Sequence, residues 1–397
     1  MKRAYIVDAA RTAVGKFGGT LASQRPDDLA AEVIKSLMLR NSNVDPADIE
    51  DVVLGAANQA GEDNRNVARM SSLLAGLPYT VPGLTINRLC ASSLQAIADV
   101  SKNIAVGYGD VYIAGGVESM SRAPFVLPKS ESAYSRSNKI YDTSIGWRFI
   151  NPKLSKMYHP YAMGETAENI VDKYQITRVE QDEFAHHSQF KYETAHNSGK
   201  FSDEIIPITI HQRKLEDIIF NKDEHPRMSS VEVLGNLRAA FKDGGSVTAG
   251  NSSGVNDGAA ALMVVSEEAL KRYNLEPIAE IVSSAAVGVS PDIMGIGPVN
   301  ATFKALERAG ISIQDIDLVE LNEAFAAQSI ACIRDLAIDP EIINVNGGSI
   351  AIGHPLGASG ARIASTLIHE LKRRKTAKYA LATMCVGVGQ GVAVIFK

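Results

Sequence analysis

The amino-acid sequence predicts an α/β protein built from two related halves. Amphipathic helical stretches alternate with short runs rich in Val, Ile and Ala, a pattern typical of βαβ units in mostly parallel sheets covered by helices. Three segments near the start of the chain also have counterparts, in the same order, in its last third. At 397 residues the chain is long enough for two or three cooperating units.

The matched segments each read as a short buried strand followed by a turn or a helix. They are 4–15 with 279–288, 48–59 with 315–326, and 109–119 with 378–389. An amphipathic helix is expected before each member of the second pair, in "LAAEVIKSLMLR" and in "ATFKALERAG". Generic βαβ units also resemble one another by chance. Three matches in one order favour an internal duplication.

Residues 122–248 belong to neither repeat. They begin with the polar, aromatic run "SAYSRSNKIYDTSIGWRFINPKLSKMYHPYAMGETAEN" and continue into helical patterns such as "RVEQDEFAHHSQFKYETAHNSG". A long irregular segment in a compact enzyme is usually a lid or a binding loop. We therefore predict an N-terminal core half at 1–121, to which 249–275 returns, a loop or lid domain at 122–248, and a C-terminal core half at 276–397.

Composition and charge exclude two classes of partner. The formal net charge of −5 argues against a nucleic-acid groove, so an anionic ligand needs a local basic patch. The longest apolar runs, such as "AALMVV", are far shorter than the ~20 residues of a bilayer span. We expect no nucleic-acid partner and no membrane insertion.

The cysteines and the ends of the chain indicate a reducing compartment. Three thiols, at Cys90, Cys332 and Cys385, are too few for a disulfide framework, and no CxxC pair or His/Cys cluster suggests zinc. Asp8 and Arg11 interrupt any signal-like apolar stretch, and the ending "VIFK" is not a peroxisomal tripeptide. We expect a cytoplasmic protein without a metal site.

Cys90 is a candidate nucleophile. Apolar positions 94, 97, 100 and 104 predict a helix whose first turn starts near this thiol. The partial positive charge of a helix N-terminus should lower the pKa of the thiol and supply thiolate near neutral pH. A lone cysteine at a buried helix start is also compatible with a small apolar packing residue.

Three further residues are candidates for the same chemistry. His354, between Gly353 and Pro355 before a predicted helix, can take a proton from a thiol, although a capping or core histidine fits the spacing too. Asn322 ends the strand "DIDLVEL", where a helix cap is the competing interpretation. Cys385 is followed by the glycines of "CVGVGQG", which would let a substrate carbon reach the sulfur and leave N–H groups free as an oxyanion hole.

The motifs of this chain resemble those of the thiolase family over essentially its whole length. They occur in the expected order, as "NRLCASSLQA", "GGVESMSRAPF", "VTAGNSSGVNDGAAAL", "GIGPV", "NEAFAAQ", "NVNGGSIAIGHPLGASGAR" and "CVGVGQG". Within the family, "ANQAGEDNRNVARM" and "TSIGWRFINP" are most similar to 3-oxoadipyl-CoA thiolases of aromatic-acid catabolism. Met163-Gly164 instead resembles acetoacetyl-CoA thiolases (acetyl-CoA acetyltransferases), although Ala162 stands where those have His. The motifs thus leave the acyl-chain preference open.

The resemblance implies a five-layered αβαβα fold and ping-pong acyl transfer between coenzyme A thioesters. It implies that Cys90 is the nucleophile, that His354 activates it, and that Cys385 moves the α-carbon proton. Asn322, through a held water, and His354 would form one oxyanion site. The backbone N–H groups of Cys90 and Gly387 would form the other.

The resemblance also implies contacts for the substrates. Arg227 in "DEHPR" matches a nucleotide-contacting Arg, although a surface Arg is usually only solvated, and Ser253 in "NSSG" matches a pantetheine-contacting Ser. Met163 and Phe325 would line the thioester pocket. For a substrate derived from a dicarboxylate, we suggest Arg148 in "GWRF" as the cation that binds its free carboxylate.

Two other classes of function compete with a catalytic thiolase. A decarboxylating ketoacyl synthase shares the doubled architecture but pairs its Cys with two His, or with His and Asn, and lacks a second cysteine in a C-terminal CxGxG. A non-catalytic CoA or lipid carrier would not need Cys90, His354 and Cys385 together. If the protein is a catalytic thiolase, we expect coenzyme A to be its substrate and product, acyl-CoA esters to be its partners, and no cofactor to be bound permanently. The family resemblance also suggests a homodimer or homotetramer that pairs across the N-terminal core.

Overall fold

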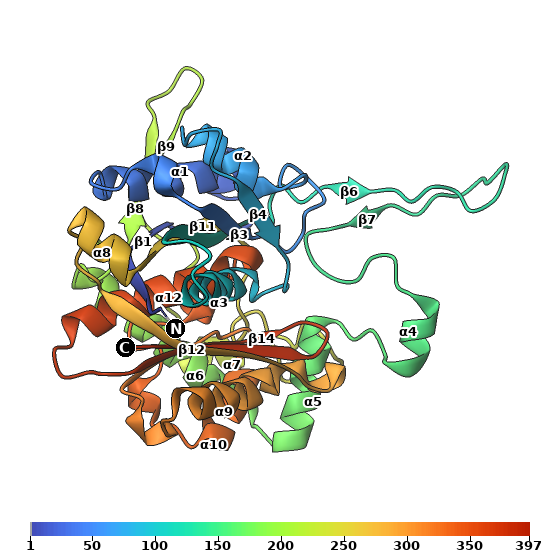
Figure 1. The fold of residues 1–397 in the computed structure, drawn as a ribbon. Helices are drawn as coiled ribbons and strands as arrows, with labels where there is room; N and C mark the ends of the chain where they lie inside the picture. Colours follow the sequence, from blue (N-terminus) through green and yellow to red (C-terminus); the bar gives the residue numbers. More distant parts are fainter. Residues whose placement is uncertain (1) are drawn as a thin grey trace.

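The computed structural model describes residues 2–397 and consists of two sheets stacked with helices between and outside them (Figure 1). The first half contains β1 Ala4–Thr12, β2 Gly15–Lys16, α1 Pro26–Arg40, β3 Asp51–Gly55, α2 Val67–Leu74, β4 Gly83–Ile86, α3 Ser92–Ala105, β5 Val111–Ser119, β11 Asn256–Ser266 and α8 Glu267–Tyr273. The second half contains β12 Ala279–Gly288, α9 Gly297–Ala309, β13 Leu318–Leu321, α10 Ala326–Leu336, α11 Ser349–Ile352, α12 Leu356–Arg373, β14 Ala380–Val386 and β15 Gln390–Phe396. Short 3₁₀ turns connect several of these elements, at Thr20–Ser23, Pro46–Asp48, Pro291–Ile296, Ile313–Asp315 and Pro340–Ile342.

The strand order confirms the internal duplication. In the first half the strands lie in the order β1-β11-β5-β3-β4, and in the second half β12-β15-β14-β13. The strands of the three segment pairs matched in the sequence therefore occupy equivalent positions in the two halves. β1 also pairs with β12, which joins the halves along one continuous path of strands.

The expectation of mostly parallel sheets is wrong. Among the strands of residues 2–397, only β3 with β4, β3 with β5, β13 with β14, and the short β8 with β1 pair in parallel. β11 reaches its place between β1 and β5 only after the inserted segment, and it runs antiparallel to both. β15 follows β14 through a tight turn and is antiparallel to it. Because neither connection is a crossover helix, the strands that they add reverse direction.

The five expected layers are confirmed. In Figure 1, α1 and α2 cover the outer face of one sheet, α9 and α10 cover the outer face of the other, and α3 and α12 lie between the sheets. The central hydrophobic cluster joins Leu94 of α3 and Leu367 of α12 to strand residues of both halves, such as Leu262 and Val394. Cys332 is buried in a separate cluster in the outer layer of the second half.

The inserted segment forms its own set of short elements. These are β6 Phe125–Val126, β7 Tyr141–Asp142, α4 Pro152–Met157, α5 Met163–Tyr174, α6 Arg178–Asn197, β8 Ile205–Ile206, β9 Ile208–Ile210, β10 Ile218–Phe220 and α7 Val231–Gly235. The β6–β7 hairpin projects away from the layered body in Figure 1. The three domain limits given above remain a proposal.

A buried ion-pair network ties the inserted segment to the core. Arg11 of β1 donates to Glu204 at 2.7 Å and, through both terminal nitrogens, to Asp223 at 2.7 and 3.0 Å. All three side chains are almost completely buried. Since breaking such a network leaves charges without partners away from water, the network fixes where the segment crosses the core.

No helix among residues 2–397 combines the length and the apolar character that a membrane crossing requires. Within the same residues, no group of three or more His, Cys, Asp or Glu side chains is arranged to hold a metal ion.

Candidate active site

A cavity of about 270 Å³ lies between the inserted segment and the core. Cys90, Met163, Arg148 and Gly387 line it, together with Leu356 at the start of α12. Two larger hollows, of about 720 and 760 Å³, contain none of the predicted site residues. The smaller cavity therefore brings together Cys90, Gly387, Met163 and Arg148, whereas His354, Cys385 and Asn322 are not among the residues that line it.

α3 and α12, which follow Cys90 and His354 in opposite halves of the chain, touch each other. Cys90 lies two residues before α3, and His354 lies two residues before α12. The helices touch at Gly360, where a Cβ atom would lie only 2.2 Å from the backbone N of Leu94. Ala361 N also donates to Ser93 Oγ at 2.9 Å. Only a glycine at position 360 permits this approach.

Cys90 stands at a strained corner of the chain. Leu89, directly before it, has a φ of +46°, which is uncommon for a residue with a side chain. Cys90 is half-buried and keeps access to the cavity that it lines. The sharp turn presents its sulfur to that cavity.

The pKa of the Cys90 thiol is shifted in the direction opposite to our expectation. Burial raises this pKa to about 11, and the N–H groups of Gly387 and of Cys90 itself only partly oppose that effect. The negative charge of Glu118 adds to the rise. The expected lowering by the helix N-terminus is therefore wrong, because desolvation of the thiolate outweighs the favourable N–H groups.

His354 is a neutral base with one free nitrogen. Its Nδ1 lies 2.6 Å from Ser359 Oγ, and this hydroxyl donates its own proton to Pro355 O at 2.9 Å. Nδ1 must therefore carry the hydrogen and donate to Ser359, which leaves the lone pair on Nε2. Nε2 is buried and has no partner among residues 2–397. Burial, with the charge of Arg362, lowers the pKa of His354 to about 3.

Cys385 lies within β14 and is almost fully buried. It packs in a small cluster with Phe325 and Met163. Burial raises the pKa of the Cys385 thiol well above its ordinary value, and the charge of Cys90 raises it further. A negative charge on Cys90 thus affects Cys385, although the two residues lie 295 positions apart in the sequence.

Asn322 directly follows β13, and its backbone N donates to Thr383 O at 3.0 Å, two residues before Cys385. Its side-chain Oδ1 accepts from Ser349 Oγ at 2.7 Å. Its Nδ2 is buried without a partner among residues 2–397. A buried amide N–H group left unpaired in this way is a donor available to a ligand or a held water.

The predicted substrate contacts divide into two groups. Met163 and Arg148 line the cavity, and Phe325 packs against Cys385 beside it. Ser253 and Arg227 do not line this cavity. Ser253 is half-buried and donates its backbone N–H to Ala324 O at 3.0 Å, and Arg227 is exposed and donates to Ala249 O at 2.6 Å.

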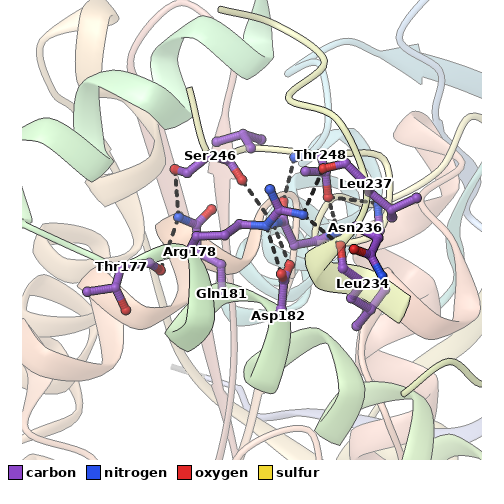
Figure 2. Close-up of polar contacts among 12 residues, drawn as sticks. Thr177, Arg178, Gln181, Asp182, Leu234, Asn236, Leu237, Ser246 and Thr248 are labelled. Carbon is purple, nitrogen blue, oxygen red and sulfur yellow. Dashed lines mark hydrogen bonds and ion pairs between the residues drawn. The ribbon is translucent and has the colours of Figure 1, made fainter. Parts of the chain in front are cut away.

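Polar contacts at the start of α6 hold the segment from Ser246 to Thr248, which precedes Ser253 in the chain (Figure 2). Arg178 pairs with Asp182 at 2.7 Å and also donates to the carbonyl of Leu234. Gln181 Nε2 donates to Ser246 Oγ at 2.9 Å. These bonds connect α6, α7 and the segment from Ser246 to Thr248, so the approach to Ser253 is fixed by the inserted segment.

Sequence reasoning missed Glu118. This buried carboxylate on the cavity wall accepts from Ala57 N (2.9 Å), Asn58 N (3.1 Å) and Gly357 N (2.7 Å). It thereby ties the end of β3 to the first turn of α12, three residues after His354. Burial raises the pKa of Glu118 to about 7. An acid within the otherwise apolar strand "VYIAGGVES" was the available signal.

Fold and site together define an enzyme that forms covalent intermediates on a cysteine. A half-buried thiol, a neutral imidazole with a free nitrogen, a second thiol and the unpaired N–H donor of Asn322 are the kinds of group that acyl transfer requires.

Comparisons with known proteins agree with this class of enzyme. Residues 4–268 match the family model of the thiolase N-terminal domain and residues 275–397 that of the thiolase C-terminal domain. The Beta-ketoadipyl-CoA thiolase of Acinetobacter baylyi is 53% identical over 400 residues, which span 100% of both chains. A 3-oxoadipyl-CoA/3-oxo-5,6-dehydrosuberyl-CoA thiolase of Escherichia coli is 52% identical over the same extent. The crystal structure of the Bacillus anthracis acetyl-CoA acetyltransferase is 44% identical with a TM-score of 0.93, covering 100% of this chain and 98% of that one.

The chain belongs to the thiolase family and is an acyltransferase.

The raised pKa of Cys90 predicts how the free enzyme reacts with iodoacetamide. The thiolate is the reacting form, and the pKa of the thiol lies near 11. The alkylation rate of Cys90 should therefore rise by about tenfold for each pH unit between about pH 7 and 9. Peptide mass spectrometry measures this rate, with buried Cys332 as an internal control that stays unmodified in the folded enzyme. A plateau near neutral pH would show that Cys90 is already ionised and would contradict the assignment.

Proposed function

We propose that this thiolase cleaves 3-oxoadipyl-CoA with coenzyme A and catalyses the reverse condensation. The supporting observation is Arg148, which among residues 2–397 is the only basic side chain that lines the cavity of Cys90. It is half-buried, donates to Asn58 Oδ1 at 2.9 Å, and has no carboxylate within ion-pair distance among residues 2–397. A guanidinium that has no carboxylate partner is suited to the free carboxylate of such a substrate. The printed names of the two relatives point to the same class of substrate.

A second candidate substrate is acetoacetyl-CoA. Met163 followed by Gly164 at the start of α5 resembles the acetoacetyl-CoA enzymes, and Met163 lines the cavity. The Bacillus anthracis neighbour is named an acetyl-CoA acetyltransferase. If acetoacetyl-CoA is the substrate, Arg148 would have only a structural role, in which its bond to Asn58 fastens the inserted segment to the core.

In the first half-reaction, the neutral His354 Nε2 takes the proton of the Cys90 thiol as the sulfur attacks the 3-keto carbon. The N–H groups of Cys90 and Gly387 stabilise the oxygen anion that forms there. Cleavage of the bond between C2 and C3 then leaves the acyl group on Cys90 and the enolate of acetyl-CoA. Cys385 protonates the enolate carbon, and acetyl-CoA departs.

The enolate oxygen needs its own donors. The newly protonated His354 Nε2–H and Asn322 Nδ2, acting through a held water, supply them. One such donor typically contributes about 3 kcal/mol to the transition state. Both atoms are buried without partners, so little rearrangement is needed when the charge develops.

The second half-reaction restores the enzyme. The Cys385 thiolate takes the proton of the incoming CoA thiol, and the CoA sulfur attacks the acyl carbon on Cys90. The Cys90 thiolate leaves and recovers its proton from His354, and the shortened acyl-CoA departs. Because both thiols have raised pKa values, the resting site holds neutral groups, and charge appears only when substrate is bound.

Coenzyme A is thus a substrate and a product, and we propose that no cofactor stays bound permanently. Ser253 would contact its pantetheine arm, and Arg227 its nucleotide. The exposed guanidinium of Arg227, bound by one nitrogen to Ala249 O, supports this role because a chain of net charge −5 needs local cations for phosphates.

We further propose a cytoplasmic homodimer or homotetramer. β4 lies at the edge of the sheet, where unpaired N–H and C=O groups can pair with a second copy, and the projecting β6–β7 hairpin carries exposed Phe125 and Ile140. The three free thiols support a reducing compartment. Light scattering on enzyme purified from the cytosolic fraction should give two or four chains per particle. A monomer, or absence from that fraction, would contradict the proposal.

A thiolysis panel tests the substrate. We expect kcat/KM to be higher for 3-oxoadipyl-CoA than for acetoacetyl-CoA and longer 3-oxoacyl-CoA esters. Arg148→Ala should lower kcat/KM for 3-oxoadipyl-CoA by about 10- to 100-fold, the range for a lost charge-assisted hydrogen bond, and leave acetoacetyl-CoA nearly unchanged. Arg136→Ala, on the exposed hairpin, is the matched control.

Each proposal fails on a different result of this panel. If Arg148→Ala leaves the ratio of the two substrates unchanged, Arg148 does not bind the carboxylate. If the wild-type enzyme prefers acetoacetyl-CoA, the second candidate substrate replaces the first.

A further inference from the structure

Only one end of the Asn322 amide can donate a hydrogen bond, so its orientation matters for the proposed oxyanion site. In the structure, Oδ1 faces Ser349 Oγ at 2.7 Å and Nδ2 is the buried end without a partner among residues 2–397. If the amide were turned over, an acceptor would face the enolate oxygen in place of a donor.

Arg362 determines the direction of the hydrogen bond between Ser349 and Asn322. Arg362 Nη2 lies 2.6 Å from Ser349 Oγ, and a guanidinium can only donate. The hydroxyl oxygen therefore accepts from Arg362, and its own hydrogen is free to be donated to Asn322 Oδ1. A turned-over amide would leave this buried O–H without an acceptor, which is unfavourable.

Arg362 is enclosed by the core. It is 1% exposed and lies on α12, eight residues after His354. Its Nη1 lies 3.5 Å from Glu320 Oε2 on β13, two residues before Asn322, and these two atoms form no hydrogen bond. The hydrogen bond from Nη2 to Ser349 Oγ and the surrounding packing therefore set the position of the guanidinium.

The Ser349 hydroxyl is not used to cap the helix in which it lies. α11 begins at Ser349 with Gly348 as its N-cap residue, and no side chain caps this helix. Ser349 is fully buried, and among residues 2–397 its oxygen bonds only to Arg362 and Asn322.

We propose that Ser349, oriented by Arg362, is a positioning residue that fixes the Asn322 amide with its N–H donor directed toward the reacting thioester. This inference rests on the proposed function, because it assigns Asn322 to the oxyanion site. Ser349 itself touches no reacting atom.

The test is a double-mutant cycle between Ser349→Ala and Asn322→Ala, followed by thiolysis of acetoacetyl-CoA so that it does not depend on the 3-oxoadipyl-CoA proposal. Ser349→Ala alone should lower kcat about tenfold, within the range for one misoriented hydrogen-bond donor, without raising the KM for CoA. In the Asn322→Ala background it should have no further effect. Ser349→Thr, which keeps the hydroxyl, should recover most of the lost kcat.

The matched control is Ser365→Ala, which removes a buried hydroxyl of α12 that has no partner among residues 2–397 and should change neither parameter. If Ser349→Ala lowers kcat by the same factor in the wild-type enzyme and in Asn322→Ala, Ser349 only supports the fold, and the inference is overturned. An unchanged kcat in Ser349→Ala would overturn it as well. Absence of turnover by the wild-type enzyme with every thioester would instead overturn the proposed function, and this inference with it.

Discussion

The close approach of α3 and α12 is the constraint on which the site depends. These helices come from equivalent positions in the two halves, and they touch where Gly360 meets the backbone of Leu94. Their N-terminal ends therefore present Cys90 and His354 at one side of the central layer. β14 and β13, which pack against α12, add Cys385 and Asn322 to the same region. An enzyme site thus follows from duplicating one βαβ arrangement and stacking the copies.

Burial then sets the chemical character of the site. The pKa of Cys90 is raised to about 11 and that of His354 is lowered to about 3, so both are neutral at pH 7. A thiol that is not ionised at rest is protected from oxidants and alkylating agents. The proton must then move from sulfur to imidazole while the substrate is bound. In the proposed mechanism, N–H donors such as the Asn322 amide stabilise the charge that this transfer creates.

The duplication could be predicted from the sequence because hydrophobic periodicity and segment order are local properties. The direction of β11 and β15 could not, since it depends on which distant strands they join. The place of Cys90 beside a helix start was predictable, but the sign of its pKa shift was not, because other elements bury the sulfur. Glu118 was signalled by its place in a buried strand, but its hydrogen-bond partners, like the Asn322 partner of Ser349, lie far away in the chain, so no short motif reveals what these side chains hold.

The central claim is that Cys90, His354 and Cys385 act in one site. Rapid mixing with acetyl-CoA, followed by peptide mass spectrometry, tests it most directly. We expect the wild-type enzyme to carry an acetyl group on Cys90. His354→Ala should slow this acetylation by about 10²- to 10⁴-fold, and Cys385→Ala should slow removal of the acetyl group by CoA. Acetylation and deacetylation of Cys90 at wild-type rates in both variants would contradict the account.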